Sequence, residues 1–228
     1  PPTPPAPPSA PPHPPVVPPS GFIVRCVVPS KRTPVPVTPK LAALGSSGRI
    51  VGGVPVFYPR QFQFQASLQY SNGYPFCGGA LISSEWVVTA AHCVPQQGSV
   101  GQVAIGMHRI STAASDDCVQ TRTVIRRFVH PDYDSGTLDS DIALLQLSEA
   151  VDYGPIALHT DSSFESAGTS VTVSGWGDTS EGGSPPDVLM HVGVPVVADE
   201  VCNTMYSGGI TANMICAGIT EGGKDSCQ

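Results

Sequence analysis

The 228-residue chain carries 18 acidic and 11 basic side chains, a formal net charge of −7. Residues 1–48 contain four basic residues and no acid, whereas residues 50–228 contain all 18 acids against six basic residues, a net charge of −12. An acidic body disfavours nucleic acid as a partner. No apolar run reaches the ~18 residues that a spanning helix needs, so we expect no membrane span.

The N-terminal part of the chain differs in composition from the rest. Residues 1–20 contain 12 prolines, and proline lacks the N–H that helices and sheets require. We therefore expect a disordered or polyproline II segment that serves as a spacer, with a docking or wall-binding segment as the alternative. Residues 21–49 are expected to be a propeptide or linker. Because Pro1 is preceded by no Met or apolar leader, we expect the true N-terminus to lie upstream.

Short apolar stretches separated by turn residues follow, which is typical of an all-β barrel or sandwich. We expect a short helix over residues 198–205. The predicted strands cover residues 63–68, 79–82, 86–89, 103–105, 121–129, 142–147, 170–174, 188–197 and 214–217.

Three motifs combine into a more specific pattern. They are Thr89-Ala90-Ala91-His92-Cys93, Phe76-Cys77-Gly78-Gly79-Ala80-Leu81-Ile82 and Asp141-Ile142-Ala143-Leu144-Leu145. Together they resemble the chymotrypsin-like (trypsin) family of serine endopeptidases. The resemblance implies an all-β, two-barrel fold for residues 50–228, whose second barrel we expect to be incomplete.

The resemblance also assigns roles to the motif residues. His92 is expected to be the general base, and Asp141 to orient its imidazole; a satisfied structural histidine is the alternative for His92, and Asp139 is the nearby competitor for Asp141. The remaining histidines are treated as non-catalytic: His13, His108, His130, His159 and His191. Two disulfides are implied, Cys77–Cys93 beside the histidine and Cys202–Cys216. The Ser174-Gly175-Trp176-Gly177 segment is expected to be structural and to lie near bound substrate.

An activation site is implied by Arg49-Ile50-Val51-Gly52-Gly53. Cleavage after Arg49 would free the α-amine of Ile50, which in this family pairs with an aspartate and orders the oxyanion hole. Glycine and serine before Arg49 make that bond accessible to a protease. An ordinary Arg–Ile bond in a loop is the alternative.

The last residues of the sequence resemble the entrance to a trypsin specificity pocket. Asp225 would lie at its base, with Ser226 and Gln228 nearby, so the resemblance implies cleavage after Arg or Lys; a surface-loop aspartate is the alternative. The family motif continues with Gly-Asp-Ser-Gly-Gly, which these 228 residues do not contain. We therefore expect the nucleophile to follow Gln228, the partner of Cys227 to lie there too, and residues 1–228 alone to be inactive.

Two features depart from the trypsin pattern. Met107 stands where calcium-binding members carry an acid, and Ca²⁺ requires oxygen ligands, so we expect no calcium site. The sequence has no Cys-x-x-Cys zinc pattern, and the resemblance implies that no metal or cofactor is needed. Cys26 and Cys118 are left over from the implied pairs, and we hypothesise that they tether the propeptide to the first barrel.

Seven cysteines favour an oxidising, extracellular compartment. We expect a secreted, monomeric zymogen that acts on proteins or peptides with Arg or Lys at the cleaved bond and that protein inhibitors can bind. Two alternatives remain: a non-catalytic homologue that acts as a binding or regulatory module, and a structural protein whose proline-rich tail is the working part.

Overall fold

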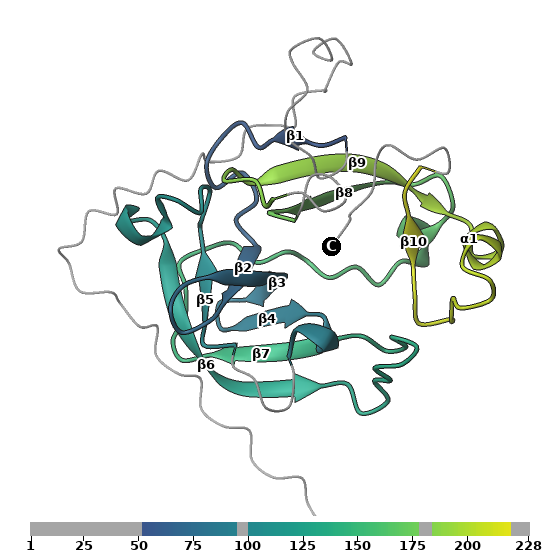
Figure 1. Ribbon diagram of the computed structural model, residues 1–228, viewed down its shortest axis with the longest axis horizontal. Coiled ribbons are helices and arrows are strands. Elements are labelled where there is room, and N and C mark those ends of the chain that lie inside the picture. Colours follow the sequence, from purple (N-terminus) through teal and green to yellow (C-terminus); the bar gives the residue numbers. More distant parts are fainter. Residues whose placement is uncertain (1–51, 95–99, 178–183, 220–228) are drawn as a thin grey trace, which may run out of the picture.

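The computed structural model describes residues 52–94, 100–177 and 184–219. Figure 1 shows the strands in two groups, with β2–β7 forming one and β1, β8 and β9 lying together above it. In chain order the elements are β1 (Val54–Pro55), β2 (Gln65–Gln69), β3 (Pro75–Ser83), β4 (Trp86–Thr89), η1 (Ala91–Cys93), β5 (Gln102–Ile105), η2 (Ala113–Ser115), β6 (Gln120–Val129), β7 (Ala143–Leu147), η3 (Ser162–Glu165), β8 (Ser170–Gly175), β9 (Met190–Val197), α1 (Asp199–Met205) and β10 (Cys216–Ala217).

The first group is a closed antiparallel barrel with the strand order β2-β3-β4-β7-β6-β5. Strand β7 alternates in burial, so Ala143, Leu145 and Leu147 point into the core. Gly79 allows β3 to approach β4, because a Cβ there would lie only 2.7 Å from the carbonyl oxygen of Val88. Closure pairs every strand of this group on both sides, so the described barrel has no open edge.

The second group is a smaller sheet built around β9, which pairs with β1, β8 and β10. Alternate residues of β9 are buried, and Met190, Val192 and Val194 form the centre of its core. Large apolar side chains nearby stay exposed, among them Leu158 at 70% and Ile215 at 58%. Over the described residues this sheet does not close.

The all-β prediction is confirmed, and every predicted strand and the predicted helix is present. Strand β4 has the predicted bounds, whereas other boundaries are corrected. Strand β3 begins at Pro75 rather than residue 79, β9 at Met190 rather than residue 188, and β10 at Cys216 rather than residue 214. Strand β1 was not predicted, because two residues carry no readable alternation. Within the described part of the chain, no helix has the length and apolarity needed to cross a bilayer.

The barrel and the sheet meet along the segment that follows β5. The amide of Leu189 donates to the carbonyl of His108 (2.8 Å), and the amide of Ile110 donates to the carbonyl of Asp187 (2.9 Å). Donation from the amide and hydroxyl of Ser111 and from Arg109 lowers the pKa of the Asp187 carboxyl. These bonds fix the orientation of the two regions, and therefore of any site that both contribute to.

Candidate active site

His92 lies on a short turn that directly follows strand β4. The apolar residues of β4 fix the strand in the barrel, and the hydroxyl of Thr89 at its end donates to the carbonyl of Gly78 on β3 (2.7 Å). The chain then forms the 3₁₀ turn η1, in which Ala91 and Cys93 are buried. With its neighbours anchored inward, His92 points outward, and 52% of its side chain is exposed.

Asp141 reaches the same place from the start of strand β7. Strands β4 and β7 are antiparallel neighbours, and Thr89 at the end of β4 pairs with Ala143 at the start of β7. The residues that follow β4 and precede β7 therefore meet at one edge of the barrel. This pairing explains how residues 49 positions apart in the sequence come into contact.

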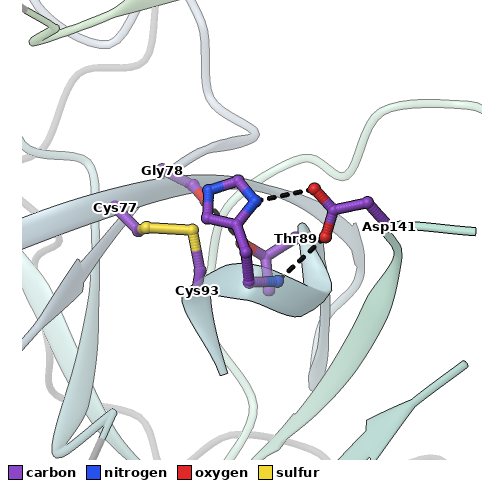
Figure 2. The surroundings of a disulfide bond; sticks show 6 residues. Cys77, Gly78, Thr89, Cys93 and Asp141 are labelled. Atoms are coloured by element: carbon purple, nitrogen blue, oxygen red, sulfur yellow. Dashed lines mark hydrogen bonds and ion pairs between the residues drawn. A yellow bond between two sulfur atoms is a disulfide. The ribbon is translucent and has the colours of Figure 1, made fainter. Parts of the chain in front are cut away.

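His92 makes two close contacts with the carboxylate of Asp141, one from its ring and one from its backbone amide (Figure 2). Nδ1 of His92 lies 2.6 Å from Oδ2 of Asp141, and the backbone amide of His92 donates to Oδ1 at 2.9 Å. With a proton on Nδ1, the opposite ring nitrogen, Nε2, carries a lone pair that can accept a proton. The arrangement can therefore hold a histidine in the tautomer and orientation that a general base requires.

The carboxylate of Asp141 also influences its surroundings. Partial burial, together with the negative charges of Asp141 and Asp134, raises the pKa of the Tyr133 hydroxyl. Tyr133 packs against the barrel core, and only 20% of the Asp141 side chain is exposed. Asp141 thus lies between solvent and core, where its attraction to an imidazolium is less screened than at the open surface.

Both predicted disulfides are formed. Cys77 on β3 bonds to Cys93 in η1, across 16 residues, and holds the turn that carries His92 against the barrel (Figure 2). Cys202 on α1 bonds to Cys216 on β10, across 14 residues. Cys118 is also disulfide-bonded, whereas Cys26, its hypothesised partner, lies outside the described residues.

The competitor Asp139 does not contact His92. Its carboxylate accepts from the hydroxyl of Thr211 and from the side-chain amide of Asn213, two residues of the loop before β10. Neither donor was predicted, because nothing in the sequence links a turn before β7 to a loop more than 70 residues later.

The other histidines of the described chain have structural surroundings. Nδ1 of His130 accepts from the amide of Asp132, and that of His159 lies 3.1 Å from the carbonyl of Asp161. Burial lowers the pKa of His191. Burial and the positive charges of Arg109 and Arg60 lower the pKa of His108. The carbonyl of His108 also accepts from the ring nitrogen of Trp176, in the segment predicted to be structural.

Two groups of side chains carry atoms of the kind that bind cations. Cys77, His92 and Cys93 lie close together, but both sulfur atoms belong to the disulfide and are unavailable as thiolates. Asp116 gives both carboxylate oxygens to the guanidinium of Arg60, at 2.7 and 2.6 Å. Met107, in the position expected to exclude calcium, is buried, and its sulfur lies 3.8 Å from the amide nitrogen of Gln69.

An open hollow of about 750 Å³ lies over the second sheet, bounded by strand β8, the Ala157–Glu165 region and the loop before β10. Its lining is mainly apolar, and neither His92 nor Asp141 contributes to it. The polar residues of its lining are His159, Glu165, Thr172 and Asn213.

The remaining predicted site residues lie outside the part of the chain that the structure describes. They are Arg49 and Ile50 of the activation site, and Asp225, Ser226 and Gln228 of the specificity pocket. Cys227 belongs to the same undescribed segment.

Comparison with known proteins identifies the family of the chain. The trypsin family model matches residues 50–228. Trypsin II-P29 of Gallus gallus is 44% identical over 185 residues, covering 79% of this chain and 71% of that protein. Trypsin-3 of Salmo salar is 43% identical (79% and 74% covered), and serine protease 1 of Rattus norvegicus is 42% identical (81% and 73% covered). The chain belongs to the trypsin family.

Proposed function

We propose that this protein is a secreted trypsin-like serine endopeptidase in which His92 is the general base and Asp141 orients it. The observation that carries the proposal is the 2.6 Å contact between Nδ1 of His92 and Oδ2 of Asp141, at the edge where β4 ends and β7 begins. In this chemistry the histidine takes the proton of the attacking serine and returns it to the leaving amine, while the aspartate stabilises the imidazolium.

The nucleophile belongs to the proposal as well. Residues 1–228 contain no Gly-Asp-Ser-Gly-Gly sequence, so we propose that the serine is encoded after Gln228. The His92–Asp141 pair without a serine can bind a proton but cannot form an acyl-enzyme. We therefore expect residues 1–228 by themselves to leave amide substrates intact.

Activation and specificity are proposed from the sequence motifs and from the trypsins among the relatives. Cleavage after Arg49 converts the zymogen, and the freed Ile50 ammonium orders the substrate site. Asp225 binds the guanidinium or ammonium group of the substrate, with Ser226 and Gln228 beside it. Because Arg49 itself fits that specificity, the active enzyme can activate its own precursor.

The test uses the protein extended through the codons that follow Gln228 and cleaved after Arg49. Peptide anilides with Arg, Lys or Phe at the cleaved bond are compared, and the first two are expected to be hydrolysed. Asp141→Asn is expected to lower kcat about 10⁴-fold, the loss seen when the orienting carboxylate of a Ser-His-Asp site is removed. His130→Ala, which changes a histidine without contact to Asp141, is the matched control and should retain full activity.

Each finer part of the proposal has its own variant. Asp225→Ser should abolish the preference for Arg and Lys, whereas Arg49→Gln should prevent conversion of the zymogen by the active enzyme. A folded, Arg49-cleaved protein that binds peptides ending in Arg but never hydrolyses them would favour the non-catalytic homologue instead.

A further inference from the structure

The turn before Asp141 has an unusual backbone. Leu138 has φ 59° and Ser140 has φ 54°, so two residues with side chains adopt the left-handed conformation on either side of Asp139. Such residues are strained unless surrounding contacts hold them. Asp141 follows Ser140 directly, so any relaxation of this turn rotates the carboxylate that contacts His92.

Bonds within the turn account for only part of its support. The amide of Leu138 donates to the carbonyl of Asp134 (2.7 Å), and the amide of Ile142 donates to the carbonyl of Ser140 (2.8 Å). The amide of Asp139 has a long contact, 3.3 Å, to the hydroxyl of Thr137. The hydroxyl of Ser140 also donates to Oδ2 of Asp139, at 3.3 Å, but none of these bonds connects the turn to the second region.

The second region supplies the missing contacts. The hydroxyl of Thr211 donates to Oδ1 of Asp139, and Nδ2 of Asn213 lies 3.2 Å from each Asp139 oxygen and 3.4 Å from the hydroxyl of Ser140. We call these four residues, Asp139, Ser140, Thr211 and Asn213, the Asp139 cluster. In the described chain Asp139 forms no ion pair. Its negative charge is therefore stabilised by hydrogen bonds from uncharged side chains.

These donors are themselves held in place. Thr211 and Asn213 lie between α1 and β10, which the Cys202–Cys216 disulfide joins. The side chain of Asn203 on α1 accepts from the amide of Ile210 (3.0 Å), directly before Thr211. Donation by Thr211 and then by Asn213 lowers the pKa of the Asp139 carboxyl, so the cluster keeps its charged acceptor throughout the neutral range.

We propose that Thr211 and Asn213 are positioning residues that act through Asp139. From the second region they hold the strained turn of the barrel, and they thereby set the orientation of Asp141 toward His92. The inference deepens the proposed function and rests on it for its catalytic meaning. The His92–Asp141 geometry itself, however, can be measured whether or not the protein is an enzyme.

The test combines two NMR readouts on the full chain. The Nδ1–H proton of His92 reports its bond to Asp141 Oδ2, and hydrogen exchange of the His92 amide reports its bond to Oδ1. Thr211→Val with Asn213→Ala is expected to weaken or shift the first signal and to speed exchange of the second about tenfold. Exchange at Leu145, in the barrel core, serves as the internal reference and should stay unchanged.

Two further variants separate positioning from a general loss of structure. Thr211→Ser keeps the hydroxyl and should preserve both signals. Thr204→Val removes the bond from a hydroxyl on α1 to the carbonyl of Glu200. This bond involves no residue of the Asp139 cluster, so its loss should also leave both signals unchanged. In the activated enzyme the double variant should lower kcat about tenfold with KM little changed, because only the orientation of the base is altered.

The outcomes distinguish this inference from the proposed function. His92 signals that respond to the double variant in a protein without activity would support the positioning role while refuting the enzyme. An active enzyme whose His92 signals and kcat are the same in the double variant and in Thr204→Val would overturn the positioning role.

Discussion

The barrel buries its large apolar side chains more completely than the second sheet does. The barrel closes on itself, and five of its large side chains, Leu68, Leu81, Val87, Ile105 and Leu145, are fully buried. The sheet centres on Met190, Val192 and Val194 and leaves Leu158, Phe164 and Ile215 exposed. The closed region carries both His92 and Asp141, whereas the open region supplies the contacts that fix the turn before Asp141. One part of the chain therefore supplies the stable barrel that carries the pair, and another part supplies the contacts that hold the turn next to Asp141.

Core truncation should give the largest effect and the clearest difference between the regions. Leu145→Ala in the barrel is expected to lower the free energy of unfolding by about 4 kcal/mol, because a closed barrel cannot collapse around the cavity. Met190→Ala should lower it by about 2 kcal/mol, since the open sheet can relax. Urea denaturation measures both.

Leu158→Ala is the matched control, since this leucine is 70% exposed. It should change the free energy of unfolding by less than about 0.5 kcal/mol. Equal decreases in the free energy of unfolding for Leu145→Ala and Met190→Ala would mean that the two cores are packed equally well. That result would contradict the difference between the barrel and the sheet.

Removal of the disulfides should give the next largest effect. Cys77–Cys93 and Cys202–Cys216 close loops of 16 and 14 residues, and on the chain-entropy account each is worth about 3 kcal/mol. Replacing each pair by alanine in turn should therefore lower the urea midpoint by similar amounts. A much smaller loss in one region would show that its remaining contacts already restrict the loop in the unfolded chain.

The Arg60–Asp116 pair offers a smaller effect within the barrel region. The Arg60 side chain is only 14% exposed, and Arg60→Met would remove the guanidinium nitrogen that donates to both oxygens of Asp116. We expect the free energy of unfolding to fall by about 2 kcal/mol, between the values for surface and buried pairs. Since the guanidinium occupies both carboxylate oxygens, Ca²⁺ and EDTA should leave the melting temperature unchanged. A rise in melting temperature with Ca²⁺ in the wild type would contradict this assignment.

The smallest effect concerns pH. Burial, mainly, lowers the pKa of His108 and His191 below the ordinary value of 6.5. Below about pH 6.5 the unfolded chain therefore binds protons that the folded chain does not, and stability should fall as the pH is lowered from 7 to 5.

Substitution tests which histidine is responsible. His191→Gln should flatten this pH dependence, whereas His130→Gln, at a histidine exposed in a turn, should not. An identical slope in the His191→Gln variant and the wild type would remove His191 from the explanation.

The comparison also shows what the sequence could and could not predict. Strands such as β7 were predictable because alternate burial leaves a period of two. The contact between His92 and Asp141 was implied by the resemblance of short motifs to the trypsin family. The two-residue strand β1 carries no period, and it pairs with β9 more than 130 residues later. The Arg60–Asp116 pair and the Asp139 cluster join single polar residues across 56 and 72 positions. Contacts of that kind depend on how completed elements pack, which no local pattern encodes.

The most direct measurement is the hydrolysis of an arginine anilide by the protein extended through the codons that follow Gln228 and cleaved after Arg49. The account predicts turnover that His92→Ala abolishes and His130→Ala leaves intact. A folded, cleaved protein that does not hydrolyse this substrate, or one whose activity survives His92→Ala, would contradict it.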